Sequence, residues 1–232
     1  MMLVRKSQIE ALFLRAKKQL FDITEEYKNS LTNQNISDLL KVDIKNFCEN
    51  LRSVLDYLSH EIHELYGFSS PNSRFYFPIL PDNSQFTSCM NQWFPSLSTK
   101  NVAIYSFLES IQPYQPNYKW LGDFNKVNNE NKHGSLVQQT REETIKITAK
   151  STIGGGSVTW APKSVKFGSS VYINGVLVNP ATQMPIPSPT QTVTKIIWVD
   201  FIFDGINQSA LKFLNDSFTG ISYIYKKLEA MI

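Results

Sequence analysis

The chain has 232 residues, of which 42% are hydrophobic and 12% aromatic, so it can bury a full core and is not disordered as a whole. Its net charge of +3, from 23 basic and 20 acidic side chains, is too small to predict nucleic-acid binding from the overall field. The first residues lack the apolar core of a secretory leader, and the longest apolar run is too short for a membrane helix. We therefore expect a cytoplasmic protein with no membrane partner.

Helical periodicity predicts two helices at the start of the chain. Apolar residues from Ile9 to Tyr27 recur three or four positions apart, which predicts a helix that ends near Asn29. After a polar link, Ser37 can cap a second helix, whose long apolar face ends before Gly67.

Residues 67–97 contain four prolines among Ser, Asn and aromatic residues, so we expect an ordered loop packed onto the helices rather than further helix. A third helix is predicted over residues 98–112. A fourth is predicted over residues 117–132, ending at Gly134.

The apolar period changes from helical to alternating near position 134. Short strands are predicted at residues 144–148, 157–160 and 164–167, and Asn174-Gly175 predicts a tight hairpin within residues 171–178. A strand at 192–203 is apolar on both faces, and the helical period returns from about Asn207. The predicted fold class is α+β. An antiparallel bundle of about five helices (residues 1–134 and 205–232) carries a small antiparallel sheet (residues 135–204) inserted before the C-terminal helix and packed on the bundle.

One flank of the second helix carries the polar stripe Arg52, Asp56, Ser59 and His63, spaced i, i+4, i+7 and i+11. Arg52 and Asp56 could form a simple ion pair on the helix surface, with His63 as a surface residue. Alternatively, a neighbouring helix faces the stripe. In that case Arg52 could hold an anion and His63 could exchange a proton near neutral pH.

The fourth helix ends in a second polar cluster. Lys132 and His133 suit the negative end of a helix dipole, but Asn128 and Asn131 continue the apolar face and need polar partners. We therefore expect the stripe to face this helix end in one pocket. The candidate catalytic residues are Arg52, Asp56, His63 and His133, and the candidate binding residues are Ser59, Asn128, Asn129, Asn131 and Lys132.

Metal and cofactor sites are not predicted. His60, His63 and His133 could ligate a metal with Asp56 or Glu64, but His60 points about 60° away from His63 on the helix. The three glycines at 154–156 lack the Lys-Ser/Thr of a phosphate loop and predict a hairpin turn instead. We expect no metal and no cofactor.

The segment from Asn50 to Leu58, followed by Asn129-Glu-Asn-Lys-His133 at the end of a later helix, resembles uncharacterised bacterial proteins with a HEPN-type helical domain. The resemblance covers about the first 135 residues and the last helix. It implies an antiparallel helical bundle, often a dimer, found in toxin, antitoxin and defence systems. Active members look like metal-independent RNases that use an Arg followed four to six residues later by His. Here Arg52 and His60 have seven residues between them, and the residue that precedes His133 with six residues between is Lys126 rather than an arginine.

Three functions remain open at this point. The leading prediction is a binding module for RNA, a nucleotide or a protein partner in defence or stress response, acting as a homodimer. The alternative is a toxin-type, metal-independent ribonuclease with Arg52, His63 and His133 in its active site. A purely structural or oligomerisation module is the third.

Overall fold

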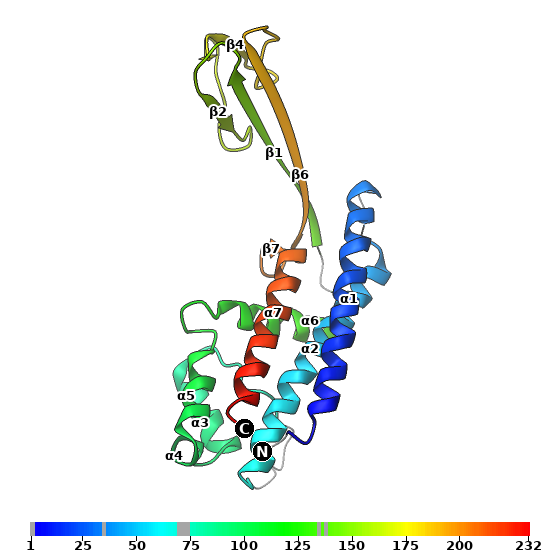
Figure 1. The fold of residues 1–232 in the computed structure, drawn as a ribbon, viewed down its shortest axis with the longest axis vertical. Helices are drawn as coiled ribbons and strands as arrows, with labels where there is room; N and C mark the ends of the chain where they lie inside the picture. The colour runs from blue at the N-terminus through cyan, green and yellow to red at the C-terminus, as the bar shows by residue number, and fades with distance from the viewer. Residues whose placement is uncertain (1–2, 34–35, 69–74, 134–135, 137–138) are drawn as a thin grey trace. The chain divides into compact units, whose positions relative to one another are not determined.

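The computed structural model describes residues 3–33, 36–68, 75–133, 136 and 139–232, without the side chains of 31–33, 132–133 and 196–199. Mixed α+β structure is confirmed, with seven described helices where the sequence predicted about five. The elements in chain order are α1 (Lys6–Asn33), α2 (Asp38–Leu65), α3 (Asn83–Trp93), α4 (Leu97–Lys100), α5 (Val102–Ser110), α6 (Lys119–His133), β1 (Gln139–Ser151), β2 (Ser157–Trp160), β3 (Tyr172–Ile173), β4 (Val176–Asn179), β5 (Met184–Pro185), β6 (Gln191–Phe203), β7 (Gln208–Ser209) and α7 (Ala210–Glu229) (Figure 1).

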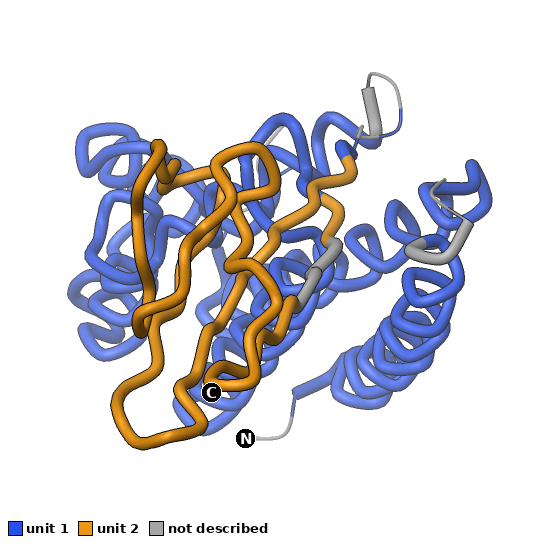
Figure 2. The backbone as a smooth tube through the Cα atoms, turned by 90° about the horizontal axis from the view of Figure 1, so that it is seen from above, with its two compact units in different colours: residues 1–140, 202–232 blue, residues 141–201 orange. Residues whose placement is uncertain are grey.

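The chain divides into two compact units (Figure 2). We call Met1–Thr140 with Ile202–Ile232 the helical unit, and Arg141–Phe201 the β unit. Of the helices that the structure describes, none combines the length and the apolar character that a membrane crossing requires.

The helical unit is organised around α2, which packs against α1, α6 and α7 (Figure 1). Ser37 caps α2 as predicted, because its hydroxyl accepts a hydrogen bond from the Leu40 amide at 3.1 Å. The helix ends before Gly67, whose φ of 61° is the left-handed conformation that glycine tolerates. The apolar face between these ends is fully buried: Leu40, Ile44, Phe47, Cys48, Leu51, Val54, Leu55, Leu58 and Ile62.

A buried carboxylate on α2 fixes the start of α1. Glu61 accepts hydrogen bonds from the amides of Val4 and Arg5, each at 2.8 Å, so a side chain from another helix satisfies amides at the beginning of α1. The Arg5 guanidinium contacts both Glu61 and Glu64, and it holds the pKa of Glu64 below its usual range. Residues 56 positions apart in sequence therefore set where the first helix begins.

The loop predicted for residues 67–97 is partly wrong, because this region contains α3 and the first residue of α4. Asp82 caps α3 by accepting a hydrogen bond from the Gln85 amide at 2.8 Å. Pro81 precedes this cap and Pro95 follows the helix, so these prolines flank α3 rather than interrupt it. The helix buries Phe86 on its inner side.

The single helix predicted over residues 98–112 is divided at Asn101 into α4 and α5. Asn101 has an extended backbone, and its side-chain oxygen accepts a hydrogen bond from the Ile104 amide at 3.0 Å. An Asn that caps the following turn competes with helix continuation, which explains the break.

The β unit is built around strand β1. The sheet that contains it has the order β2-β1-β6-β7, and β3-β4-β5 form a second antiparallel sheet. The predicted hairpin is confirmed: Asn174 and Gly175 have φ values of 51° and 77°, as a two-residue turn with positive φ requires. The small hydrophobic core of the β unit consists of Ile147, Ala149, Trp160, Ile173 and Val178.

The strand predicted at residues 164–167 is wrong. The amide of Phe167 donates to the Gln183 side chain at 2.7 Å, and the same side chain donates back to the Phe167 carbonyl at 3.0 Å. Because a side-chain amide satisfies both backbone groups, this segment needs no neighbouring strand.

Gly220→Ala tests the packing of α6 on α7. Alanine normally stabilises a helix interior by about 1 kcal/mol relative to glycine, but here a Cβ would overlap the Trp120 indole ring. We expect a net loss of about 1–3 kcal/mol in the free energy of unfolding, measured by urea denaturation. Gly168→Ala is the matched control, because the Cβ added there meets open space. Equal stability of Gly220→Ala and the wild type would contradict the packing.

Candidate functional site

Arg52 lies in the interior of the helical unit with three polar partners. It is 7% exposed, and its guanidinium contacts the Asp56 carboxylate at 3.1 Å, the Asn125 side-chain oxygen at 3.2 Å and the Phe77 carbonyl at 3.1 Å. The predicted ion pair with Asp56 is therefore present, although it is not a surface pair. Asn125 belongs to α6, so the structure brings the stripe on α2 to the helix that we expected to face it.

The Arg52–Asp56 pair holds a segment of backbone that is neither helix nor strand. Asp56 accepts a hydrogen bond from the Phe77 amide at 2.8 Å, while Arg52 donates to the carbonyl of the same residue. In the residues that follow Phe77, the buried Gln112 side chain accepts a hydrogen bond from the Leu80 amide at 2.9 Å and donates one to the Pro78 carbonyl at 3.0 Å. The charged groups of Arg52 and Asp56 both bind protein atoms. Their observed contacts are therefore those of residues that anchor the backbone at Phe77 to α2.

His63 is buried against aromatic rings. Its side chain is 5% exposed, and its ring centroid lies 4.7 Å from that of Phe75, 5.6 Å from Phe68 and 6.2 Å from Phe94. The interpretation of His63 as a surface residue is therefore wrong, because the segments on both sides of residues 69–74 cover it. A proton-transfer role for His63 stays a prediction.

The helix α6 carries the buried amides that its sequence pattern indicated. Asn128 is 1% exposed and Asn131 is 6% exposed, in line with Leu121 and Phe124 on the apolar face. Within the described part of the chain, neither amide atom of Asn128 has a hydrogen-bond partner, and the same holds for the hydroxyl of Ser59 on α2. Unsatisfied buried polar groups cost stability, which makes these positions unusual.

The predicted convergence at the end of α6 is only partly described. Asn129 is exposed, whereas its neighbours Asn128 and Asn131 are buried, so these three amides do not share one side of the helix. The side chains of Lys132 and His133 lie outside the described residues. On α6, the observed partner of Arg52 is Asn125, a residue that the sequence did not single out.

Two further chemistries find no support among the described side chains. They contain no group of three or more His, Cys, Asp or Glu placed to hold a metal ion, although His133 is outside that search. Both cysteines are buried, and burial raises the pKa of Cys48 to about 12 and that of Cys89 to about 11. These thiols are therefore protonated near neutral pH and poor nucleophiles.

Two features outside the predicted site carry charge patterns that point to ligands. Residues 144–199 contain five lysines and no acidic residue, a signal that the sequence shows but the overall charge hides. A pocket lies between α1 and α7, and only their packing could reveal it.

No family model, curated protein or solved structure matches this chain.

Asp56→Ala is expected to lower the free energy of unfolding by about 2–4 kcal/mol. It leaves the buried Arg52 guanidinium without a carboxylate and the Phe77 amide without its acceptor. Glu49→Ala is the matched control, because Lys45 and Glu49 form an i, i+4 pair at 3.8 Å on the same helix with both side chains 35% exposed. That change should cost about 0.5 kcal/mol or less. Equal losses in urea denaturation would show that the anchor is no stronger than a surface pair.

Asn128→Leu is expected to leave the free energy of unfolding unchanged or raise it by up to about 1 kcal/mol. Leucine has the same branching and removes two buried polar atoms that have no partner in the described structure. The exposed neighbour Asn129→Leu, measured in the same thermal and urea melts, should be neutral. A loss above about 2 kcal/mol for Asn128→Leu would reveal a partner for the amide.

Proposed function

We propose that the protein is a non-catalytic RNA-binding module whose β unit carries the binding surface. The observation behind this proposal is the distribution of charge between the two units. The β unit contains six basic and three acidic residues, so the formal charge of +3 resides there and the helical unit is neutral overall. Within residues 144–199 no acidic residue occurs at all, whereas an even distribution would place about five there.

The outer face of the β1–β2 pair presents cations and hydroxyls together. Ile147 and Ala149 point into the core of the β unit, so the alternating residues Lys146, Thr148 and Lys150 lie on the opposite face. The strand register places Thr159 beside Thr148, with their hydroxyls 2.9 Å apart, and Ser157 beside Lys150. Lysine ammonium groups and hydroxyls are common donors to phosphate oxygens.

An exposed aromatic ring in the same unit supports single-stranded RNA as the ligand. Tyr172 on β3 is 63% exposed although its neighbour Ile173 is buried. Single strands offer unpaired bases that stack on aromatic side chains, and lysines beside them follow the backbone. A duplex offers no such bases, so we expect it to bind more weakly.

The ribonuclease alternative has less support from the described contacts. Arg52 would have to hold the scissile phosphate, yet its guanidinium already contacts Asp56, Asn125 and the Phe77 carbonyl. His63 is enclosed by aromatic rings, and the side chain of His133 is outside the described residues. RNA cleavage through these groups remains a prediction, and the binding experiment below also tests it.

HEPN-type membership, a homodimer and a role in defence are kept as parts of this proposal. The helical unit supports only the HEPN-type part: α1 and α2 pack side by side, Arg52 belongs to α2, and Asn129 to His133 form the end of α6 (Figure 1). The homodimer and the role in defence rest on the resemblance alone. In this proposal the helical unit binds the protein partner or a second copy of the chain, and the β unit binds RNA.

The experiment measures fluorescence anisotropy of a labelled single-stranded RNA of about 20 nucleotides with the full chain, in EDTA, from about 50 to about 200 mM KCl. Each phosphate contact contributes about 0.7 to the slope of log affinity against log salt. Lys146→Gln with Lys150→Gln should reduce this slope by about 1.4 and weaken binding about tenfold.

The matched control removes two lysines from the helical unit, Lys18→Gln with Lys227→Gln, which leaves the same net charge as the test variant. The control should bind like the wild type. Equal weakening of both variants would overturn a specific surface on the β unit, and salt-independent binding would overturn phosphate recognition. RNA that a gel shows to be cleaved by the wild type but not by His63→Ala would favour the ribonuclease.

A further inference from the structure

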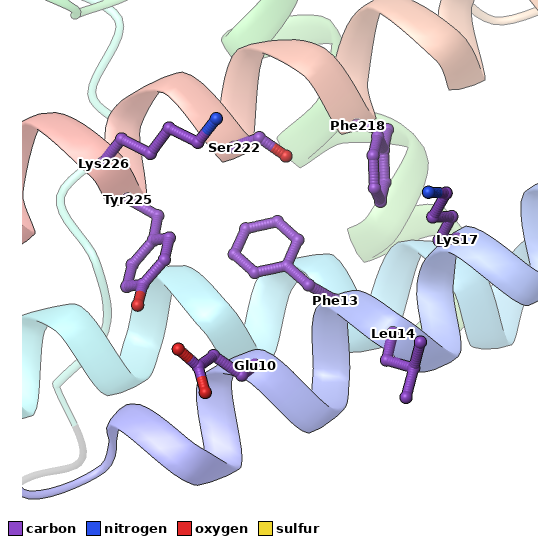
Figure 3. Close-up of a pocket in the computed structure, with 8 residues that line it drawn as sticks. All are labelled: Glu10, Phe13, Leu14, Lys17, Phe218, Ser222, Tyr225 and Lys226. Carbon is purple, nitrogen blue, oxygen red and sulfur yellow. The ribbon is translucent and has the colours of Figure 1, made fainter.

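A pocket of about 340 Å³ opens between α1 and α7 within the helical unit (Figure 3). Its volume falls in the range of small-molecule sites, about 300–1,000 Å³. It is lined by residues of these two helices: Glu10, Phe13, Leu14, Lys17, Phe218, Ser222, Tyr225 and Lys226.

Aromatic rings form the body of the pocket. The Phe13 ring projects from α1 toward α7 and lies between Phe218 and Tyr225 (Figure 3). Its centroid is 5.9 Å from that of Phe218, edge to face, and 5.4 Å from that of Tyr225. Leu14 stands beside these rings and is 73% exposed. An apolar trough that remains open to solvent favours a ligand with an apolar body.

Cations border the trough without carboxylate partners. Lys226 and Ser222 are four residues apart on α7 and present an ammonium and a hydroxyl along one side of the pocket (Figure 3). Lys17 reaches the opposite end from α1. In the described chain, neither Lys17 nor Lys226 has a carboxylate within 4.0 Å, whereas Lys6 pairs with Glu229 and Lys212 pairs with Asp216.

The acidic groups near the pocket lie on the Tyr225 side. Tyr225 donates a hydrogen bond to Glu229 at 3.0 Å, and burial raises the pKa of its hydroxyl, so it stays neutral. Glu229 is itself neutralised by Lys6 at 2.8 Å. Glu10 lies beside the Tyr225 ring (Figure 3). Glu10 belongs to α1, whereas Ser222 and Lys226 lie across the pocket on α7 (Figure 3). A ligand anion therefore avoids Glu10 and meets Ser222 and Lys226, which fixes the orientation of the ligand.

We propose that this pocket binds a small aromatic carboxylate. The carboxylate contacts the Lys226 ammonium and the Ser222 hydroxyl, and the ring system packs on Phe13 and Phe218 toward Leu14. Charge-assisted hydrogen bonds fix one end of the ligand and ring contacts the other, which is how apolar pockets with few polar groups select ligands. This site is separate from the RNA surface of the β unit and does not depend on it.

The probe is 2-naphthoate, titrated into the full chain labelled with ¹⁵N and followed by amide chemical shifts. We expect saturable shifts at α1 and α7 residues around the pocket, with a Kd on the order of 0.1–1 mM for a ligand of this size. The uncharged naphthalene-2-carboxamide should bind about tenfold more weakly, because it cannot pair with Lys226.

Adjacent lysines provide matched variants. Lys226→Gln should weaken 2-naphthoate binding about tenfold and Ser222→Ala about threefold, whereas Lys227→Gln should leave it unchanged because Lys227 stands over the Tyr223 ring outside the pocket lining. Lys17→Gln and Lys18→Gln form a second pair on α1. Each variant should melt at the same midpoint temperature as the wild type, which establishes that its fold is intact.

Three results would overturn the proposal. The first is equal affinity for the carboxylate and the carboxamide, which would remove the role of charge. The second is equal binding by Lys226→Gln and Lys227→Gln. The third is shifts that do not saturate or that avoid α1 and α7.

Discussion

A buried arginine–aspartate pair on α2 is the constraint on which the helical unit depends. Arg52 and Asp56 bind the carbonyl and the amide of Phe77, so a stretch without helix or strand is fixed to the central helix. Gln112, two residues after the end of α5, fixes the same stretch, and Asn125 brings α6 to the pair. Because a buried ion pair is favourable only when its hydrogen bonds are complete, the position of each of these elements depends on the others.

This arrangement separates the polar groups that hold the fold from the lysines that we propose as ligand contacts. Four polar side chains on α2 contact protein groups: Arg52 and Asp56 anchor Phe77, His63 packs on rings, and Glu61 caps α1. A stretch of sequence with lysines and no acidic residues lies in the β unit, and two further lysines border the α1–α7 pocket. Cations next to hydroxyls or aromatic rings are common in anion recognition, which is why both proposals concern anionic ligands.

Local signals in the sequence predicted local structure well. Ser37, Gly67 and Asn174-Gly175 act at short range, so the limits of α2 and the β3–β4 hairpin followed from their neighbours alone. The sequence does not predict α3, because prolines that flank a helix give the same signal as prolines that interrupt one. The i, i+4 spacing in the sequence predicted the contact between Arg52 and Asp56. Their other partners lie 21 to 73 residues away, and helical periodicity carries no information about contacts at that separation. The pocket likewise depends on how α1 meets α7, which composition does not encode.

The central claim is that ligand contact belongs to the β unit while the polar groups of α2 hold the fold. Lysine acetylation measured by mass spectrometry, with and without single-stranded RNA, tests it directly, because bound phosphates shield ammonium groups. The account predicts that RNA protects Lys146, Lys150, Lys163, Lys166 and Lys195, while Lys18 and Lys227 of the helical unit stay reactive. Protection confined to lysines of the helical unit, or none at saturating RNA, would contradict it.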